Sequence, residues 1–311
     1  MADTRNDTPT AIPETLVRRL EAQYGAEVSA RILTGFEARR PTTLRANALK
    51  ADRAAIARQL DDAGIAWDPA PAPALSDAFV LRGAREVAVR DLPAYSAGEL
   101  YLQSLSAMLP ALALDPRPGE NILDMAAAPG GKTCQMAALS GGGAFITACE
   151  KNHVRAERLR YNLARQGAAR VTVMECDARK LDEFFRFDKI LLDAPCSGSG
   201  TVQAGTGARK CGFSDELLAR SVKTQQALLR RALDVLAPGG VLVYATCSIL
   251  ADENEGVLER VLPNSGAELE PLPEGLLEGV PLLPCRLPEA AGVCPTDLFE
   301  GFFVALVKKK R

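Results

Sequence analysis

Apolar runs alternate with amphipathic stretches over most of this 311-residue chain. From residue 121 onward, six short, mainly apolar runs predict buried strands: NILDMA, AFITACE, VTVMECD, KILLDAP, GGVLVYATC and GFFVALV. Apolar residues recur at helical spacing in stretches that begin near Lys132, His153 and Phe213. This alternation predicts an α/β fold built on a doubly wound, mainly parallel sheet. The last run follows a loop-rich stretch, residues 263–297, and we expect it to be an antiparallel edge strand.

The pattern of the first 92 residues predicts a smaller α+β module. Residues 13–36 show apolar positions at helical spacing, and Pro13 suits the first turn of a helix. A short strand, TTLRAN, and a helix, ADRAAIARQLDDAG, come next, and IAWDP and FVLRG are further candidate strands. We expect a helix over AGELYLQSLSAMLPALAL to lead into the larger unit. The pattern therefore predicts two domains, residues 1–92 and residues 93–311.

The composition is that of an ordinary globular protein, with 47% apolar and 24% charged residues. No stretch approaches the roughly 18 uninterrupted apolar residues of a membrane span, and the polar N-terminus shows no secretory signal. Eight cysteines without C-x-x-C spacing and a single histidine, His153, argue against a metal site and against a disulfide framework. We therefore expect a cytoplasmic protein that binds no metal.

Basic residues are unevenly distributed, although the net charge of −2 predicts no global attraction to nucleic acid. Residues 1–60 contain ten Lys and Arg against seven Asp and Glu, and residues 151–170 contain six against one. The first region includes Arg39, Arg40, Arg45, Lys50, Arg53 and Arg58. A third group occupies residues 308–311. Each cluster alone is typical of a solvated surface, but together they favour a polyanionic substrate.

Acidic residues lie at or near the ends of four successive predicted strands. They are Asp124, Glu150, Asp177 and Asp193. Open α/β sheets bind their ligands at the carboxyl ends of parallel strands. Glu150 follows Asp124 by 26 residues, close to the spacing of the acid that accepts ribose hydroxyls in dinucleotide folds. Asp177 is then a candidate partner for an adenine amino group, and Asp193 for the ammonium end of a cofactor.

The loop AAAPGGKT, residues 126–133, allows two interpretations. A phosphate loop requires G-x-x-x-x-G-K-[ST], because its glycine amides wrap the phosphates. Here Ala126 takes the first glycine position and Pro129 removes an amide donor, and both weaken a nucleoside triphosphatase interpretation. The alternative is an adenosyl cofactor laid across the first strands, which the four acids favour.

Cys196 and Cys247 differ from the other cysteines in position, because each follows a predicted strand, in DAPCSGSG and YATCSI. The others are expected to be small buried hydrophobes or loop residues. Thiolate attack is the reaction that cysteine performs best near neutral pH. A thiolate added to C6 of a pyrimidine turns the weakly nucleophilic C5 into an enamine carbon that attacks an activated methyl group. The residues alone do not decide which cysteine attacks.

Several segments together resemble the RNA (cytosine-5) methyltransferases of the Sun/RsmB/RsmF family, most strongly the RsmF branch. They are TTLRANALK, YLQSLSAMLP, LDMAAAPGGKT, LLDAPCSGSG, YATCSI, DENE and EGFFVAL. The resemblance implies a Rossmann-like methyltransferase sheet over residues 93–311 and an RNA-binding α+β module over residues 1–92. It also implies S-adenosylmethionine as methyl donor and 5-methylcytosine in RNA as product.

The resemblance further implies roles for individual residues. Cys247 would attack C6 of the cytosine, and Cys196 would assist release of the methylated product. Asp193 and Lys132 would lie near the target base and the methyl donor. The implied cofactor site is lined by Ala126, Ala127, Ala128, Pro129, Gly130, Gly131, Lys132, Glu150, Arg155, Asp177 and Asp193.

The RsmF branch suggests small-subunit ribosomal RNA as substrate, either free or within the assembling subunit. Transfer RNA is an alternative, and a nucleoside triphosphatase or a non-catalytic RNA-binding protein is less favoured. Two departures bear on the target. Residues 202–212, VQAGTGARKCG, replace the basic, Pro-Asp-containing stretch usual after the Cys196 motif, and the chain ends at Arg311 without the C-terminal RNA-binding region of longer relatives. Target choice is therefore expected to rest on the N-terminal module and the basic surface.

Overall fold

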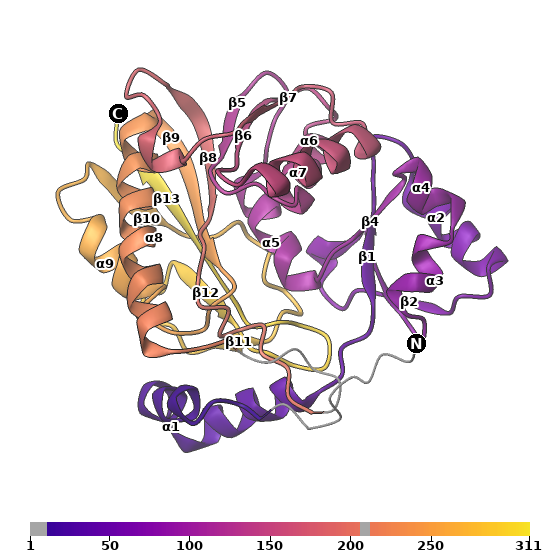
Figure 1. Ribbon diagram of the computed structural model, residues 1–311, viewed down its shortest axis with the longest axis horizontal. Helices are drawn as coiled ribbons and strands as arrows, with labels where there is room; N and C mark the ends of the chain where they lie inside the picture. The colour runs from indigo at the N-terminus through magenta and orange to yellow at the C-terminus, as the bar shows by residue number, and fades with distance from the viewer. Residues whose placement is uncertain (1–10, 206–211) are drawn as a thin grey trace.

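A nine-stranded sheet dominates the computed structural model, which describes residues 11–205 and 212–311. Its strand order is β11-β12-β13-β9-β8-β5-β6-β7, with β10 paired to β13 (Figure 1). The parallel strands are β5 (Asn121–Asp124), β6 (Phe145–Cys149), β7 (Val171–Met174), β8 (Phe187–Asp193) and β9 (Leu236–Thr246). The antiparallel strands are β10 (Ala267–Glu270), β11 (Leu282–Leu283), β12 (Ala290–Val293) and β13 (Phe302–Lys309).

Helices cover both faces of this sheet, so the predicted doubly wound α/β fold is confirmed. On one face pack α5 (Leu105–Leu114), α6 (Gly131–Leu139) and α7 (His153–Gln166). On the other pack α8 (Asp215–Val235), α9 (Glu255–Val261) and the short 3₁₀ turn η2 (Ala178–Lys180). Successive strand residues point to opposite faces: Ile122 contributes to the first core and Leu123 to the second. Both faces of the central strands are therefore buried.

The last strand is antiparallel as predicted, but the expectation that it is an edge strand is wrong. β13 pairs with β9 on one side and with β12 and β10 on the other. Two short strands within residues 263–297, β10 and β12, pair with its outer side, and β11 pairs in turn with β12. Frequent Pro and Gly residues between these strands give the stretch the pattern of a loop. The buried residues Phe302–Val307 agree with this interior position.

A second, four-stranded antiparallel sheet forms the small module. Its order is β2 (Trp67–Pro69), β3 (Ala78–Leu81), β1 (Thr43–Ala46) and β4 (Leu100–Leu102). The elements that accompany it are α2 (Arg53–Asp62), η1 (Pro73–Leu75), α3 (Glu86–Arg90) and α4 (Pro93–Ala97). Leu44, Ile56, Leu60 and Phe79 are fully buried in the core of this module. An α+β module is therefore present, as the pattern predicted.

The stretch predicted as one helix over AGELYLQSLSAMLPALAL is instead β4 followed by α5. Gly98 adopts a left-handed conformation with φ of 73° and ends α4. The chain then runs extended, and Leu44 of β1 pairs with Leu102. The pairing partner is far away in sequence, so local periodicity does not reveal this strand.

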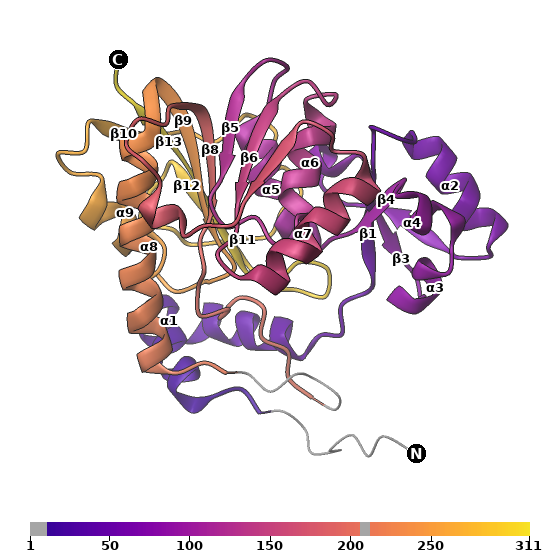
Figure 2. The same ribbon diagram turned by 45° about the horizontal axis from the view of Figure 1, so that its top comes forward.

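The first helix, α1 (Glu14–Glu37), lies below the lower end of the large sheet and apart from β1–β4 (Figures 1 and 2). It has a kink at Gly25, where φ is 75°. Its buried residues Leu16 and Ile32 pack with Phe213 and Leu250 of the larger unit.

The division into two domains between residues 92 and 93 stays a prediction. Across the described residues, every helix is too short or too polar to span a membrane.

Candidate active site

Cys196 and Cys247 lie side by side at the carboxyl edge of the large sheet. Cys196 follows β8 and Cys247 follows β9, and these two strands are adjacent and parallel. The two Sγ atoms are 2.7 Å apart, although 51 positions separate the residues in sequence. The fold thus brings together the two cysteines that their strand-end positions singled out.

Buried polar groups fix the loops that carry these cysteines. The Glu253 carboxylate accepts hydrogen bonds from the Ser197 N–H at 2.8 Å and from the Ser197 hydroxyl at 2.6 Å. The Gln225 side-chain amide donates to the same carboxylate at 3.1 Å. Across the two loops, the Ser199 and Ser248 hydroxyls are hydrogen bonded at 2.8 Å. All of these side chains except that of Ser197 are fully buried, so losing one partner would leave a buried polar atom unpaired.

The surroundings of Cys196 disfavour its thiolate. Its hydrogen bond with Cys247, burial and the nearby Glu253 carboxylate all raise the pKa of the Cys196 thiol well above its usual value. A thiol with a raised pKa is a poor nucleophile at neutral pH, but it still donates a hydrogen bond. The Cys196 thiol is therefore available as a hydrogen-bond donor beside the Cys247 sulfur.

An ion pair between Lys132 and Asp193 lies near the cysteines. Lys132 Nζ donates to Asp193 Oδ2 at 2.6 Å, and the Phe302 ring lies 5.4 Å from the same nitrogen. Burial by itself lowers the pKa of Lys132, but the Asp193 carboxylate and the charges of Asp124 and Cys247 outweigh it and raise the pKa. Lys132 therefore remains a cation at neutral pH.

The carboxylate of Asp124 joins the end of β5 to the first turn of α6. The Thr133 hydroxyl donates to its Oδ2 at 2.7 Å, and the Ala126 N–H donates to its Oδ1 at 3.4 Å. Burial raises the pKa of Asp124 to about 6, although the hydrogen bond from Thr133 opposes the shift. This buried contact shapes the glycine loop.

The loop between β5 and α6 turns at Gly130, which has φ of 109°. A Cβ added at Gly130 would lie 2.9 Å from Leu159 Cδ1, and one added at Gly131 would lie 3.1 Å from the Tyr101 ring. The loop therefore needs glycine at position 130 for its conformation, and a side chain at either position would also push its neighbours aside.

Two cavities flank this loop, and Ala126 lines both. The walls of the first include Met125, Glu150, Arg155, Asp177, Pro195 and Leu228. The walls of the second include Tyr101, Gln103, Asp124, Pro129, Lys132 and Asp193. Every residue of the predicted cofactor site lines one of these cavities except Gly130, whose neighbours Pro129 and Gly131 both line the second.

Arginine side chains hold two of the acids in place. The Arg155 guanidinium pairs with the Glu150 carboxylate at 3.2 Å and donates to the Ala128 carbonyl at 2.8 Å, so it connects the end of β6 to the glycine loop. Arg179 pairs with Asp177 at 2.5 Å. These hydrogen bonds lower the pKa of Asp177 to about 2 and keep it ionised.

Comparison with known families now identifies this architecture. The sequence model described as "16S rRNA methyltransferase RsmB/F" matches residues 111–308. A second, described as an RsmF/B-like "ferredoxin-like domain", matches residues 12–88. The first match alone spans more than half of the chain. The protein belongs to the RsmB/F methyltransferase family.

Relatives of this RsmB/F protein carry related names. It is 35% identical over 276 residues to ribosomal RNA small subunit methyltransferase F of Shewanella frigidimarina, which covers 86% of this chain and 56% of the relative. It is 37% identical over 246 residues to the 26S rRNA (cytosine-C(5))-methyltransferase nsun-1 of Caenorhabditis elegans, with coverages of 78% and 36%. The chain thus spans about half or less of the length of these curated relatives. The crystal structure of a methyltransferase homologue from Pyrococcus horikoshii has a TM-score of 0.78 at 30% identity, over 96% of this chain and 100% of that one.

One arginine of the basic N-terminal region of this RsmB/F protein faces inward. Arg45 is 3% exposed, and its guanidinium donates to Gln103 Oε1 at 2.9 Å and to the Gly131 carbonyl at 3.2 Å. Arg40 similarly donates to the Thr296 carbonyl at 3.1 Å. The expectation that Arg45 belongs to a basic surface is therefore wrong, because its charge serves buried acceptors.

Sequence reasoning missed Tyr101 and Gln103, which line the second cavity of the RsmB/F site. Both lie in or directly after β4, within the stretch predicted as one helix. Recognising a strand after Gly98 would have placed them at the edge of the small sheet, facing the loop. Residues 206–211 of VQAGTGARKCG, Cys211 among them, lie outside the described residues.

Proposed function

We propose that this protein is an S-adenosylmethionine-dependent enzyme that forms 5-methylcytosine in ribosomal RNA. The observation that carries the proposal is the pair of cysteine sulfurs 2.7 Å apart at the carboxyl edge of the sheet. The Lys132–Asp193 ion pair and the glycine loop lie at the same edge. A nucleophilic thiol and a cofactor loop are the parts that this reaction requires, and the second thiol lies where it can assist the departing sulfur.

The cavity walls fit the chemistry of an adenosyl cofactor. The Glu150 carboxylate, 4% exposed, suits the ribose hydroxyls, and Asp177 remains the candidate for the adenine amino group. Met125 and Leu228 supply apolar contact for a purine ring. The Asp193 carboxylate lines the second cavity and suits an ammonium group. A cofactor held by these residues supplies an electrophilic methyl group.

The two cysteines take different parts in the proposed reaction. The Cys247 thiolate adds to C6 of cytosine, which breaks the C5–C6 π bond and makes C5 nucleophilic. C5 would then take the methyl group as its bond to the donor sulfur breaks, with the electron pair left on that sulfur. A base then removes the proton from C5, and the electron pair re-forms the double bond as the Cys247 sulfur leaves. Cys196 supports the departing thiolate, because its protonated thiol lies 2.7 Å away and donates a hydrogen bond to it.

Small-subunit ribosomal RNA is the proposed substrate, free or in the assembling subunit. The family description names 16S rRNA, and the Shewanella relative is named for the small subunit. A cytosine within a stem would have to leave the stack, since attack at C6 requires access to the face of the ring.

Transfer of labelled methyl groups tests the reaction and the substrate together. The protein is incubated with methyl-labelled S-adenosylmethionine and with total RNA or small subunits from a strain lacking its gene. We expect label in 5-methylcytidine from small-subunit RNA. Label in transfer RNA or in large-subunit RNA would correct the substrate, and an absence of label in every RNA would overturn the proposed reaction.

Substitution of each cysteine tests the proposed roles. We expect Cys247→Ala to abolish methylation, and Cys196→Ala to accumulate a covalent protein–RNA adduct, visible as a slower band on a denaturing gel. Cys285→Ala, outside both cavities, is the matched control and should retain activity. Normal turnover by the Cys247→Ala protein would refute the assignment.

A further inference from the structure

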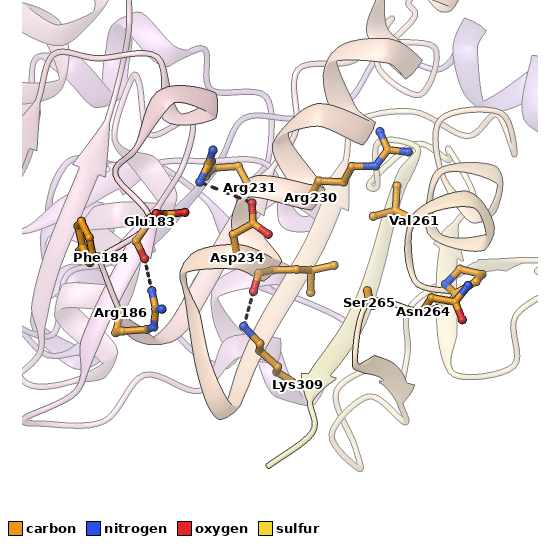
Figure 3. Close-up of a pocket in the computed structure, with 12 residues that line it drawn as sticks. Glu183, Phe184, Arg186, Arg230, Arg231, Asp234, Val261, Asn264, Ser265 and Lys309 are labelled. Carbon is orange, nitrogen blue, oxygen red and sulfur yellow. Dashed lines mark hydrogen bonds and ion pairs between the residues drawn. The ribbon is translucent and has the colours of Figure 1, made fainter.

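A cavity of about 830 Å³ lies at the edge of the large sheet opposite the cysteines (Figure 3). The loop before β8, the last turns of α8, the segment after α9 and the end of β13 surround it. Because β8 has seven residues, its start and its catalytic end lie roughly 20 Å apart. This cavity is therefore separate from the proposed active site.

Positive charge predominates around this cavity. Its walls carry Arg186, Arg230, Arg231 and Lys309 against two acids, Glu183 and Asp234. Lys309 and Arg186 donate hydrogen bonds to backbone carbonyls. Lys309 Nζ donates to the Leu233 carbonyl at 2.6 Å and to the Leu236 carbonyl at 2.8 Å. The Arg186 guanidinium donates to the Phe185 carbonyl at 2.7 Å. A carbonyl satisfies the donor without neutralising the charge. Burial, followed by the positive charge of Arg186, lowers the pKa of Lys309, which agrees with an excess of positive charge here.

Two side chains of the cavity are available to a ligand. Arg230 is exposed and, within the described part of the chain, makes no side-chain hydrogen bond or ion pair (Figure 3). Phe184 is 85% exposed, although aromatic rings are usually covered. The next residue, Phe185, stacks on Phe187 with ring centroids 5.9 Å apart, and this anchors the loop that presents Phe184.

We propose that this cavity is a second RNA-docking site, which holds a single-stranded segment of the substrate away from the target cytosine. Arginines around a depression suit phosphodiester groups, and an exposed aromatic ring suits a stacked base. An acidic peptide would use the charges but has no base to stack on Phe184, so the combination favours RNA. The inference rests on the proposed RNA substrate and adds the surface that positions it.

Binding of a fluorescent 12-residue oligouridine tests this site without engaging the cytosine chemistry. We expect Phe184→Ala and Arg230→Glu each to weaken binding by about fivefold or more. Arg230→Glu should also reduce the salt dependence of binding, because a phosphate contact is lost, whereas Phe184→Ala should not. The matched controls are Phe145→Ala, a half-exposed phenylalanine elsewhere, and Arg117→Glu, the same charge change outside the cavity.

Two further measurements locate the contact. An oligonucleotide carrying 4-thiouridine should cross-link to the peptide that contains Phe184. On long substrate RNA, Phe184→Ala should raise KM and leave kcat unchanged, while activity on a minimal target stem stays the same. Binding equal to that of the controls together with no cross-link at Phe184 would overturn the proposal, as would preference for an acidic peptide over oligouridine. A failure of the proposed methylation would appear instead as an absence of 5-methylcytidine from RNA treated with the unsubstituted protein.

Discussion

Asp124 links the stability of the site to pH. Burial raises its pKa to about 6 in the folded protein, against an ordinary value of 3.8. The folded state therefore keeps this proton to a higher pH than the unfolded chain, and the contribution of Asp124 to stability falls as the pH rises from about 4 to about 6. The Asn side chain of Asp124→Asn stays neutral. We therefore expect this variant to lack the decrease in the free energy of unfolding over this pH range, which is on the order of 2–3 kcal/mol for the unsubstituted protein.

Urea unfolding of both proteins at several pH values measures this difference. The comparison uses the slope of unfolding free energy against pH, so a constant cost of the substitution at the Thr133 hydrogen bond cancels. If the two proteins show the same slope between about pH 4 and 6, the acid responsible is a different one.

The sequence predicted the position of a single site residue where that position depends on the residue's own segment. Cys196, Cys247 and Asp193 each close or follow an apolar run, and Lys132 follows two glycines, so position within a strand–loop pattern placed them. Arg45 could not be placed in this way. Its role depends on Gln103 and Gly131, which lie 58 and 86 residues away.

Among the elements, α1 holds the loop that carries Cys247. The Tyr24 hydroxyl donates to the Ile249 carbonyl at 2.6 Å, and the Gln23 amide donates to the same carbonyl at 3.1 Å. Gln23 Oε1 in turn accepts from the Ala251 N–H at 2.9 Å. The two side chains thus brace the backbone two to four residues after the cysteine.

Removal of these contacts should affect turnover more than substrate binding. We expect Tyr24→Phe to cost about 1 kcal/mol of stability, because Gln23 still serves the carbonyl, and Gln23→Ala to cost more and to lower kcat, because the Ala251 N–H loses its acceptor. Steady-state kinetics and thermal unfolding measure both effects, with Glu21→Ala on the exposed side of α1 as control. A rise in KM at unchanged kcat would indicate that α1 contacts the RNA instead.

Elements were predictable where apolar strand runs alternate regularly with amphipathic helices. The five parallel strands follow that alternation, whereas β4 directly precedes the apolar helix α5 and β10–β12 lie in a stretch interrupted by Pro and Gly. Such short strands are defined by a partner: Leu102 by Leu44, and Gly292 by Phe303. That information lies in the tertiary pairing, so the sequence pattern alone placed β4 in a helix and β13 at an edge.

In the whole molecule, Arg45 joins the small sheet to the glycine loop of the larger unit. It rises from β1 of the small sheet and reaches the Gly131 carbonyl at the start of α6, with its guanidinium 5.4 Å from the centre of the Tyr101 ring. Burial lowers the pKa of Arg45 to about 10, so it remains charged at neutral pH. The small module therefore contributes directly to the shape of the glycine loop, in addition to the RNA contacts proposed for it.

Arg45→Met should separate these two contributions. The substitution keeps much of the volume but removes the donors to Gln103 and Gly131, so the loop loses a charged hydrogen-bond partner. We expect the affinity for S-adenosylmethionine, measured by calorimetry, to fall about tenfold, which corresponds to the loss of one such contact. Arg53→Met, which removes a cation from the same module near Trp67, should leave cofactor affinity unchanged. If Arg45→Met instead weakens RNA binding and spares the cofactor, Arg45 acts on the path of the RNA, and the small module does not shape the cofactor loop through this residue.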